Sequence, residues 1–331
     1  MNSYCLQIKS LNKPIAKNNA IEELNLNIDQ GKKIALLGLN GAGKSSLMRL
    51  LVGENKADSG EILYQENYLE NIPSKSVLKN TQINLQPTDI NFKRFLGYQA
   101  DTMLAIDEMS SQQYLELCGH LKGLSPAVIN ERIKLISQQW ELENILDKKM
   151  NELSKGNLQK LVISQVFINQ PKWLFFDEPC QSLDPLEQER FNRNIKNLED
   201  YNLCVFSTHN VKHAIDIADK IILYHQSKII YIFDLEKENN RYLLMIKNND
   251  MVFDDLAKCL NITINSIEKQ LYLFENVSSD KYQKIEKHLK QQQQDYEFFL
   301  PEKQAIMPLF RLLASGEFQL THSLNNEANQ S

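Results

Sequence analysis

Apolar residues in this chain fall into short runs that end at glycine, proline or charged residues. Residues 33–37 form one such run after Gly31, and residues 173–176 and 203–206 form two more. Continuous apolar runs of this length are typical of strands buried in a parallel sheet. Residues 46–51 continue with good helix formers up to Gly53, which predicts a helix directly after the first run. The pattern predicts an α/β fold.

Between these runs the period of the pattern changes to that of a helix. Apolar side chains recur at helical spacing over residues 114–121, and a second helix over residues 128–140 follows Ser125-Pro126, a good helix start. We expect a helical insertion over about residues 102–152. The stretch from Tyr64 to Phe95 is long for its place in the pattern, and we expect a surface loop or an extra hairpin in its middle.

The pattern changes again after residue 233. A charged segment over residues 234–240 precedes a predicted strand over 242–246 and a helix over 252–260. Strands over 262–267 and 271–274, a polar helix over 280–294 and an apolar helix over 306–313 follow. This β-α-β-β-α order predicts a small α+β domain of the ferredoxin-like type over residues 234–320. Its simplest interpretation is a dimerisation or regulatory appendage. The polar residues 321–331 are expected to be a disordered tail.

Composition limits the classes of function. The chain has 331 residues, 42% of them hydrophobic, and a net charge of −5, which argues against a dedicated nucleic-acid binder. It has no apolar stretch near the ~20 residues that span a bilayer and no secretory signal pattern at its start, so we expect a cytoplasmic protein. Its five cysteines lack metal-type spacing and are interpreted as reduced, mostly buried thiols.

The first candidate site is a glycine-rich loop between the first strand and its helix. It fits the phosphate-binding pattern G-x-x-x-x-G-K-[ST] at every fixed position. In such a loop backbone N–H groups cradle phosphate oxygens, the lysine reaches the β- and γ-phosphates, and the serine hydroxyl ligates Mg²⁺. ATP and Mg²⁺ are the expected cofactors. The candidate nucleotide-binding residues are Gly38, Leu39, Asn40, Gly41, Ala42, Gly43, Lys44, Ser45 and Ser46.

Two adjacent carboxylates end a second apolar run. Asp177 and Glu178 follow residues 173–176, and Pro179 stops the strand. In a phosphate-loop fold the Asp lies beside Mg²⁺, and the Glu is placed to polarise the attacking water as a general base. By itself this pair could be an ordinary strand end with an exposed turn, but the phosphate loop favours the catalytic interpretation.

The segment just before this strand carries a further anion-binding pattern. Ser154 and Gly156 stand where a loop opens a helix, within the sequence Leu-Ser-Lys-Gly-Asn of residues 153–157. This segment resembles the L-S-G-G-Q signature of ATP-binding cassette (ABC) ATPases, and its place before the Asp-Glu strand is similar too. Asp184 follows at the spacing of that family's D-loop. His209, after residues 205–208, is similar to its switch histidine, whereas alone it would more simply be a surface histidine.

The resemblance covers roughly residues 1–233 and implies a mechanism. ABC ATPases pair head to tail, so that each ATP lies between the phosphate loop of one subunit and the signature of the other. Ser154 and Gly156 would then contact the partner's γ-phosphate, Asp184 would communicate across the interface, and His209 would bond the γ-phosphate in cis. Lys44, Glu178 and His209 are the expected catalytic residues. Ser45, Asp177 and either Gln99 or Asp101, the two candidates for the family's Q-loop residue, are expected at Mg²⁺.

Two departures from the family pattern bear on activity. The signature has Lys155 in place of the first family glycine and Asn157 in place of glutamine, while Ser154 and Gly156 are kept. The stretch over residues 12–16, where the family usually places an aromatic residue against adenine, has none. Ile15 could supply an apolar face there, and we expect weaker affinity or selectivity for the base.

The resemblance implies the ATPase subunit of an ABC transporter, at the cytoplasmic face of a separate membrane permease and paired with a second nucleotide-binding subunit. Gly97-Tyr98 and residues 121–124 favour the exporter group of the multidrug or ABC-2 type. The alternative is a non-transport ABC ATPase acting on ribosomes or nucleic acid, although such proteins usually carry two cassettes or a long coiled coil. A degenerate, regulatory cassette is disfavoured because Lys44, Asp177, Glu178 and His209 are all present.

Overall fold

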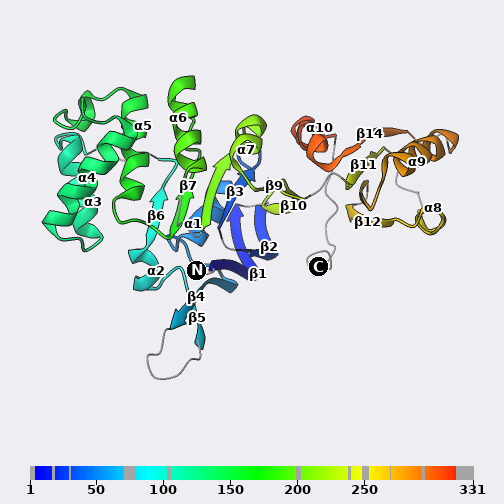
Figure 1. Cartoon of the computed structure of the whole chain (residues 1–331), viewed down its shortest axis with the longest axis horizontal. Helices are drawn as coiled ribbons and strands as arrows, with labels where there is room; N and C mark the ends of the chain where they lie inside the picture. Colours follow the sequence, from blue (N-terminus) through cyan, green and yellow to red (C-terminus); the bar gives the residue numbers. More distant parts are fainter. Residues whose placement is uncertain are drawn as a thin grey trace.

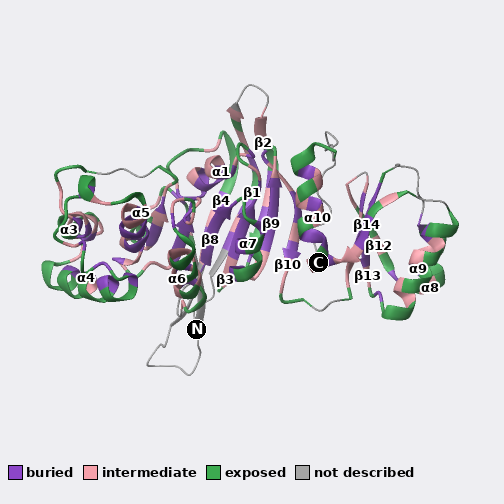
Figure 2. Cartoon of the chain, turned by 90° about the horizontal axis from the view of Figure 1, so that it is seen from above, coloured by how far each residue is buried: buried purple, intermediate pink, exposed green. Residues whose placement is uncertain are grey.

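A computed structural model describes residues 4–16, 19–29, 31–70, 79–102, 106–198, 203–237, 240–247, 253–268, 270–292 and 295–317. Three sheets organise this part of the chain. Figure 1 shows a group of helices at one end, two sheets in the middle and the third sheet at the other end. Figure 2 shows the same row from above, with the buried residues concentrated in the middle sheets.

The central sheet has six strands in the order β10-β9-β3-β8-β7-β6. All neighbouring strands are parallel except β10, which returns antiparallel beside β9. The strands that carry the predicted motifs therefore end at one edge of the sheet. The strands are β3 (Lys32–Leu37), β6 (Leu96–Gln99), β7 (Trp173–Phe176), β8 (Leu203–Thr208), β9 (Lys220–His225) and β10 (Lys228–Asp234).

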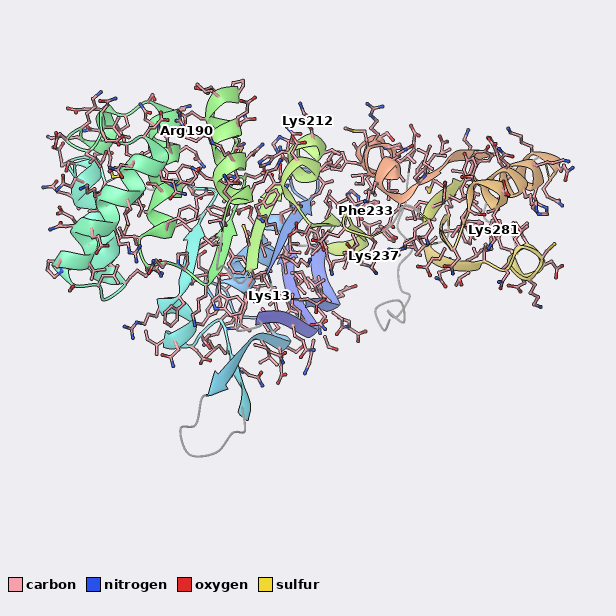
Figure 3. All side chains as sticks on the ribbon, viewed as in Figure 1. Lys13, Arg190, Lys212, Phe233, Lys237 and Lys281 are labelled. Atoms are coloured by element: carbon pink, nitrogen blue, oxygen red, sulfur yellow. The ribbon has the colours of Figure 1, made fainter. Side chains whose placement is uncertain are left out.

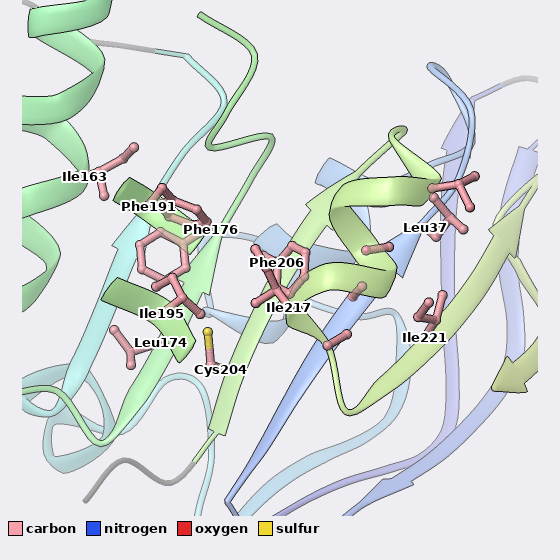
Figure 4. Packing of buried hydrophobic residues seen from close by; sticks show 14 of the residues in the cluster. Leu37, Ile163, Leu174, Phe176, Phe191, Ile195, Cys204, Phe206, Ile217 and Ile221 are labelled. Atoms are coloured by element: carbon pink, nitrogen blue, oxygen red, sulfur yellow. The ribbon is translucent and has the colours of Figure 1, made fainter. Parts of the chain in front are cut away.

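Both faces of this sheet are covered, which explains its continuous apolar runs. On β7, Leu174 and Phe176 face a cluster that includes α6 (Pro185–Lys196) and α7 (Val211–Ile217). Trp173 and Phe175 face the opposite cluster, which includes α1 (Lys44–Leu51). Figure 4 shows Phe176 against Phe191 of α6, where the two rings meet edge to face with centroids 5.5 Å apart.

A second, antiparallel sheet covers the α1 side in the order β2-β1-β4-β5. It consists of β1 (Tyr4–Ala16), β2 (Asn19–Ile28), β4 (Ser59–Glu70) and β5 (Lys79–Leu85), followed by α2 (Ile90–Arg94). Tyr64 pairs with Leu85 and Glu70 with Lys79, so the long stretch after Tyr64 contains the extra hairpin. The middle of that stretch, residues 71–78, lies outside the described residues.

The helical group contains α3 (Ser111–Leu121), α4 (Pro126–Trp140) and α5 (Lys155–Ser164), with short 3₁₀ turns over Met150–Glu152 and Gln165–Phe167. Ser110 and Gln113 form a capping box at the start of α3. Arg190 of α6, labelled in Figure 3, is ion-paired at 2.7 Å with Glu141 at the end of α4. This contact joins the helical group to the helix that covers the central sheet.

The third sheet has the strand order β12-β13-β11-β14, with all neighbours antiparallel. The sequence pattern missed one strand, β14, so the observed order is β-α-β-β-α-β followed by a helix. This order and pairing are those of a ferredoxin-like fold. The elements are β11 (Tyr242–Ile246), α8 (Asp254–Leu260), β12 (Thr263–Glu268), β13 (Leu271–Glu275), α9 (Ser279–Gln291), β14 (Tyr296–Pro301) and α10 (Glu302–Ser315).

Helix α10 joins the third sheet to the central one. Its buried residues share one apolar cluster with α7 and β10, close to Phe233, which Figure 3 labels. At the start of α10, the buried Glu302 accepts a hydrogen bond from the Tyr231 hydroxyl at 2.9 Å and pairs with Arg241 at 3.2 Å. Arg241 also pairs with Glu275 at 3.2 Å. The third sheet is therefore anchored to the core by both apolar and charged contacts.

Two predictions, the start of the final helix and the burial of the cysteines, are wrong. The final helix begins at Glu302, earlier than predicted, and tolerates Pro308 in its interior. The cysteines are not mostly buried: of the four whose side chains are described, Cys204 is buried, Cys118 and Cys180 are partly exposed and Cys259 is exposed, all as free thiols. Within the described ranges, no helix has the length and apolar character needed to cross a bilayer.

Candidate functional site

The glycine-rich loop connects the end of β3 to α1, as the sequence predicts. It begins beside β8, because the Gly38 N–H donates to the Thr208 carbonyl at 3.1 Å. A side chain at Gly38 would place its Cβ 2.3 Å from the Tyr224 carbonyl oxygen, so the backbones can approach only with glycine here. Gly43 precedes the helix with φ 96°, a conformation that favours glycine. The close approach at Gly38 and the backbone conformation of Gly43 explain why the motif needs glycine at both positions.

The other loop residues turn the loop back on itself and against the β9–β10 turn. The Ala42 N–H donates to the Leu39 carbonyl at 3.2 Å, and the Ala42 carbonyl accepts from Ser227 at 2.9 Å. Asn40 and Gly41 are exposed at the tip, whereas Ser46 lies half-buried on α1. The tip is therefore the open side of the loop, where a ligand can reach its backbone.

Lys44 is buried at the first position of α1, and its ammonium group has three oxygen neighbours. It donates to the carbonyl oxygens of Gly38 at 2.9 Å and Leu39 at 3.1 Å. Its third neighbour is Oε1 of Glu178, at 3.0 Å. Lys44 thus links the phosphate-binding loop directly to the acidic end of β7.

Asp177 and Gln99 lie side by side at the ends of β7 and β6. The Asp177 N–H donates to the Gln99 carbonyl at 2.9 Å, and the Gln99 side-chain amide donates to the Asp177 carbonyl at 3.2 Å. Both side chains are buried, yet Gln99 Oε1 and Asp177 Oδ2 have no hydrogen-bond partner in the described structure. Two buried oxygens without partners, with the Ser45 hydroxyl near enough to Asp177 to influence its pKa, fit the oxygen ligands that Mg²⁺ prefers.

Asp101, the other candidate for the Q-loop residue, is exposed and lies two residues beyond the end of β6. It is close enough to Asp177 to raise the pKa of that carboxyl by charge repulsion. It makes no backbone pairing with β7 comparable to that of Gln99 in the described residues. The geometry therefore favours Gln99 of the two.

Burial raises the pKa of Asp177 above its ordinary value, because the charged form loses contact with water. The hydroxyl groups of Ser207 and Ser45 lower the pKa of Asp177, whereas the charges of Asp101 and Glu178 add to the rise. A cation at this place would offset the cost of burying the carboxylate. The electrostatics of Asp177 are thus those of a carboxylate built to face a positive charge.

Glu178 contacts both Lys44 and His209. Its backbone is left-handed, with φ 47°, which turns the side chain out of line with β7. Its Oε1 pairs with Lys44 at 3.0 Å, and its Oε2 lies 3.0 Å from Nδ1 of His209. The carboxylate is mostly buried, with 12% of the side chain exposed, whereas 47% of His209 is exposed. The structure thus brings together Lys44, Glu178 and His209, the three residues predicted to be catalytic.

Sequence reasoning missed Ser207. This serine is fully buried on β8, and its hydroxyl donates to Asp177 Oδ1 at 2.5 Å and accepts from the Glu178 N–H at 2.9 Å. The residue stands two positions before His209 in the predicted strand, but only the pairing of β7 with β8 shows that it meets the acidic pair.

The signature residues lie apart from this cluster. Ser154 caps α5, with its hydroxyl accepting from the Asn157 N–H at 3.3 Å, and Asp184 caps α6 by accepting from Glu187 at 2.9 Å. A Cβ at Gly156 would lie 3.6 Å from the Ser182 carbonyl, so the two helix starts are neighbours. Figures 1 and 2 show α5 in the helical group, away from α1. Within one chain, the structure does not bring the signature to the phosphate-binding loop.

Ile15, the residue predicted to offer an apolar face to the base, lies beside the loop. Its Cδ1 atom would be 3.5 Å from a Cβ built at Gly43, and its side chain is partly exposed. The Tyr224 ring is at the same distance from that Cβ, but Tyr224 is fully buried. Of these two side chains next to Gly43, the aliphatic one is the more accessible.

A cleft of about 540 Å³ opens where the helical group meets the core. The end of α1, the start of β6 and the end of α3 surround it. Its lining combines apolar and charged residues: Val52, Gly53, Glu54, Lys93, Leu96, Gly97, Tyr98, Lys122, Gln165 and Val166. Lys122 is held at the rim by donating to the Leu96 carbonyl at 2.7 Å and the Lys93 carbonyl at 3.1 Å. Because β6 forms one wall and ends at Gln99, the cleft adjoins the candidate nucleotide site.

Comparisons with known proteins agree with this geometry. Residues 21–181 match the family model described as ABC transporter. The chain is 31% identical over 227 residues to the probable sulfate/thiosulfate import ATP-binding protein CysA of Chlorella vulgaris, a match that covers 68% of this chain and 89% of the relative. It is 26% identical over 230 residues to the spermidine/putrescine import ATP-binding protein PotA of Aggregatibacter actinomycetemcomitans, which covers 69% of this chain and 57% of PotA.

A solved structure shows the same fold. The dimeric structure of MJ0796, a bacterial ABC transporter cassette, superposes with a TM-score of 0.59 over 70% of this chain and 100% of that chain, at 22% identity. The chain therefore belongs to the family of ABC transporter ATP-binding proteins, and the predicted ABC ATPase fold is confirmed. CysA and PotA are both named as import proteins, so the comparisons do not confirm the predicted exporter group.

Proposed function

We propose that this chain is the ATP-hydrolysing subunit of an ABC transporter, acting as a head-to-tail dimer around two ATP molecules and coupled to a membrane permease. The observation that carries the proposal is the position of Glu178, whose carboxylate lies between Lys44 and His209 and next to Asp177. These are the groups that ATP hydrolysis requires, and they come from three separate parts of the sequence.

The phosphate groups of ATP would bind at the open side of the Gly38–Ser45 loop. Backbone N–H groups and the positive end of α1 attract the anion there, and Lys44 supplies a full positive charge. Ser45, Asp177 and Gln99 would hold Mg²⁺, which when bound neutralises part of the charge on the β- and γ-phosphates. We assign Gln99 as the Q-loop residue because its bare side-chain oxygen lies next to Asp177.

Glu178 would act as the general base, orienting a water molecule toward the γ-phosphate. Its left-handed backbone aims the carboxylate at the loop rather than along the strand. His209 contacts the same carboxylate and is exposed enough to bond a phosphate oxygen from the cis side. Catalysis in such a site depends mainly on positioning and on charge stabilisation of a loose transition state.

The second subunit would complete each site. Ser154 and Asp184 are exposed, and both stand at the starts of helices, where a second subunit can reach them. In a head-to-tail pair, Ser154 and Gly156 of one subunit would reach the γ-phosphate bound by the other, and Asp184 would lie at the interface. The separation of these two sets of residues within one chain supports the pairing.

The permease would dock in the cleft between the helical group and the core, which adjoins Gln99 through β6. A change at the nucleotide could then reach the permease along one strand. We propose the cytoplasmic face of the membrane as the place of action. The proposal is for transport without a stated direction, since the relatives named above give export no support.

Glu178→Gln tests the hydrolytic part of the proposal. The variant should lose ATP turnover while keeping ATP binding, and it should accumulate as an ATP-bound dimer in size-exclusion chromatography. Glu143→Gln, at an exposed position of the helical group, is the matched control and should hydrolyse ATP at the normal rate. Normal turnover by Glu178→Gln would remove Glu178 from the role of base.

A pull-down tests the partner. Tagged Glu178→Gln protein would be recovered from detergent-solubilised membranes with ATP and Mg²⁺, and its companions identified by mass spectrometry. Recovery of one polytopic membrane protein supports the transporter. Recovery of ribosomal proteins, or of this chain alone, contradicts it and favours a non-transport ABC ATPase.

A further inference from the structure

Ser207 lies at the carboxyl ends of two neighbouring strands, β7 and β8, where the candidate catalytic residues follow. Phe176 of β7 pairs with Phe206 of β8, so the next residues, Asp177 and Ser207, meet at the carboxyl edge of the sheet. Ser207 is fully buried, and so is Asp177. A hydroxyl in such a place must find partners within the protein, because water does not reach it.

The hydroxyl has two partners, and they are consecutive residues. It donates to Asp177 Oδ1 at 2.5 Å and accepts from the Glu178 N–H at 2.9 Å. A serine hydroxyl has one hydrogen to donate and lone pairs to accept, so one group satisfies both contacts. The bond to the carboxylate is charge-assisted and therefore short and strong.

The second contact acts on a strained backbone. Glu178 has φ 47°, a left-handed conformation that is unfavourable for a residue other than glycine and persists only where the surroundings hold it. The Ser207 hydroxyl holds the N–H of that residue. This bond helps to keep the Glu178 carboxylate pointing at Lys44 and His209 instead of continuing the direction of β7.

We infer that Ser207 is a positioning residue for ATP hydrolysis, whose single hydroxyl fixes the Mg²⁺-binding face of Asp177 and the backbone of Glu178 at the same time. With Oδ1 engaged by Ser207, Oδ2 of Asp177 has no hydrogen-bond partner in the described structure and is the oxygen that would ligate Mg²⁺. Because Ser207 is fully buried and hydrogen-bonds Asp177 and Glu178, it would act on hydrolysis through these two residues. The inference rests on the proposed function, because it assigns the two carboxyl groups their roles in hydrolysis.

The test compares Ser207→Ala with Ser207→Thr, which restores the hydroxyl on a side chain suited to a strand. Loss of a hydrogen bond to a charged group predicts a fall in kcat of roughly 10- to 100-fold in Ser207→Ala, with KM for ATP changed less than about twofold. Ser207→Thr should recover most of the rate. Ser137→Ala removes a buried hydroxyl from α4, where it donates to the Lys134 carbonyl, and should leave kcat unchanged.

A binding measurement separates this inference from the hydrolytic proposal. Affinity for a fluorescent ATP analogue would be measured with EDTA and with Mg²⁺. In Ser207→Ala the affinity in EDTA should stay within about twofold of wild type, while the gain in affinity on adding Mg²⁺ should shrink several-fold. An unchanged Mg²⁺ effect, or an equal loss in EDTA, overturns the role of Ser207. If wild-type protein fails to hydrolyse ATP, the proposed function fails, and this binding comparison still decides the inference.

Discussion

The Lys44 ammonium group and Oε1 of Glu178 are 3.0 Å apart, with 6% and 12% of the two side chains exposed. The residue that would bind phosphate and the residue that would activate water are therefore ion-paired with each other. The other two neighbours of the ammonium group are backbone carbonyls of its own loop. Of the three, Glu178 is the only side chain, so it is the partner that an incoming phosphate can displace.

This competition predicts that Glu178→Gln binds ATP more tightly than wild type. Neutralising the carboxylate removes the ion pair that phosphate must replace, a gain of about 1 kcal/mol or roughly fivefold in affinity. Titration with a fluorescent ATP analogue in EDTA measures the change without hydrolysis. Glu143→Gln is the control, and equal affinities of wild type and Glu178→Gln would show that the ion pair does not oppose binding.

The side of the site that would face the adenine base of ATP predicts a gain in ATP affinity from one substitution. Ile15 lies next to Gly43 with a partly exposed aliphatic side chain, where a base can pack but not stack. In Ile15→Tyr an aromatic ring would face the base, and stacking is worth about 1 kcal/mol, or roughly fivefold in affinity. Isothermal titration with ATP and with inorganic triphosphate checks this: ATP should bind more tightly and triphosphate should not. An equal gain in affinity for triphosphate would show that the substitution does not act through contact with the adenine base.

The sequence predicted those parts of the site that depend on consecutive residues. The loop around Lys44 and the pair Asp177-Glu178 have fixed local spacing, and each sits where the motif predicts. The role of Ser207 depends on the pairing of β7 with β8, which no local pattern contains. The choice between Gln99 and Asp101 depended on where β6 ends, because a shift of two residues in the pairing with β7 would exchange one side chain for the other beside Asp177.

The third sheet likewise contains a strand that the local sequence pattern did not predict. Strand β14 follows a polar glutamine-rich segment, and its residues Tyr-Glu-Phe-Phe-Leu-Pro do not alternate, so the pattern gave no clear strand period. Its place is fixed by pairing along β11, from Tyr242 with Pro301 to Ile246 with Tyr296. Tertiary pairing thus supplied the strand that completes the ferredoxin-like order.

His213 predicts a loss of stability in acid. Burial lowers the pKa of His213 from 6.5 to about 4, although the charges of Glu178 and Asp216 raise it somewhat. Its ring also contacts Cys180 Sγ at 3.4 Å and Thr208 Oγ1 at 3.5 Å. Above pH 6.5 the imidazole is neutral in both folded and unfolded chains. As the pH falls from 6.5 toward 4, His213 becomes protonated in the unfolded chain but stays neutral in the folded one. The free energy of unfolding therefore falls by roughly 3 kcal/mol in total.

A His213→Gln variant should therefore lose less stability than wild type between pH 6.5 and 4. Urea unfolding followed by tryptophan fluorescence is suited to the measurement, because Trp140 and Trp173 are both buried in the core. His120→Gln, at an exposed position on α3, is the control and should follow wild type. Parallel acid profiles for wild type and His213→Gln would mean that His213 titrates normally in the folded protein.

The junction between the third sheet and the core predicts a local loss of stability in Glu302→Ala. The substitution removes the acceptor of the Tyr231 hydroxyl and one partner of Arg241, both largely buried. Arg241 keeps Glu275, so we expect the free energy of unfolding to fall by about 2 kcal/mol, less than for a buried charge left with no partner.

Hydrogen exchange should show faster exchange in α10 and β11 of Glu302→Ala and little change at β3 and β8. Glu286→Ala, which breaks the exposed ion pair with Lys290 on α9, should alter exchange only near α9. Uniform protection of α10 in Glu302→Ala would mean that the apolar contacts with α7 and β10 alone hold the third sheet in place.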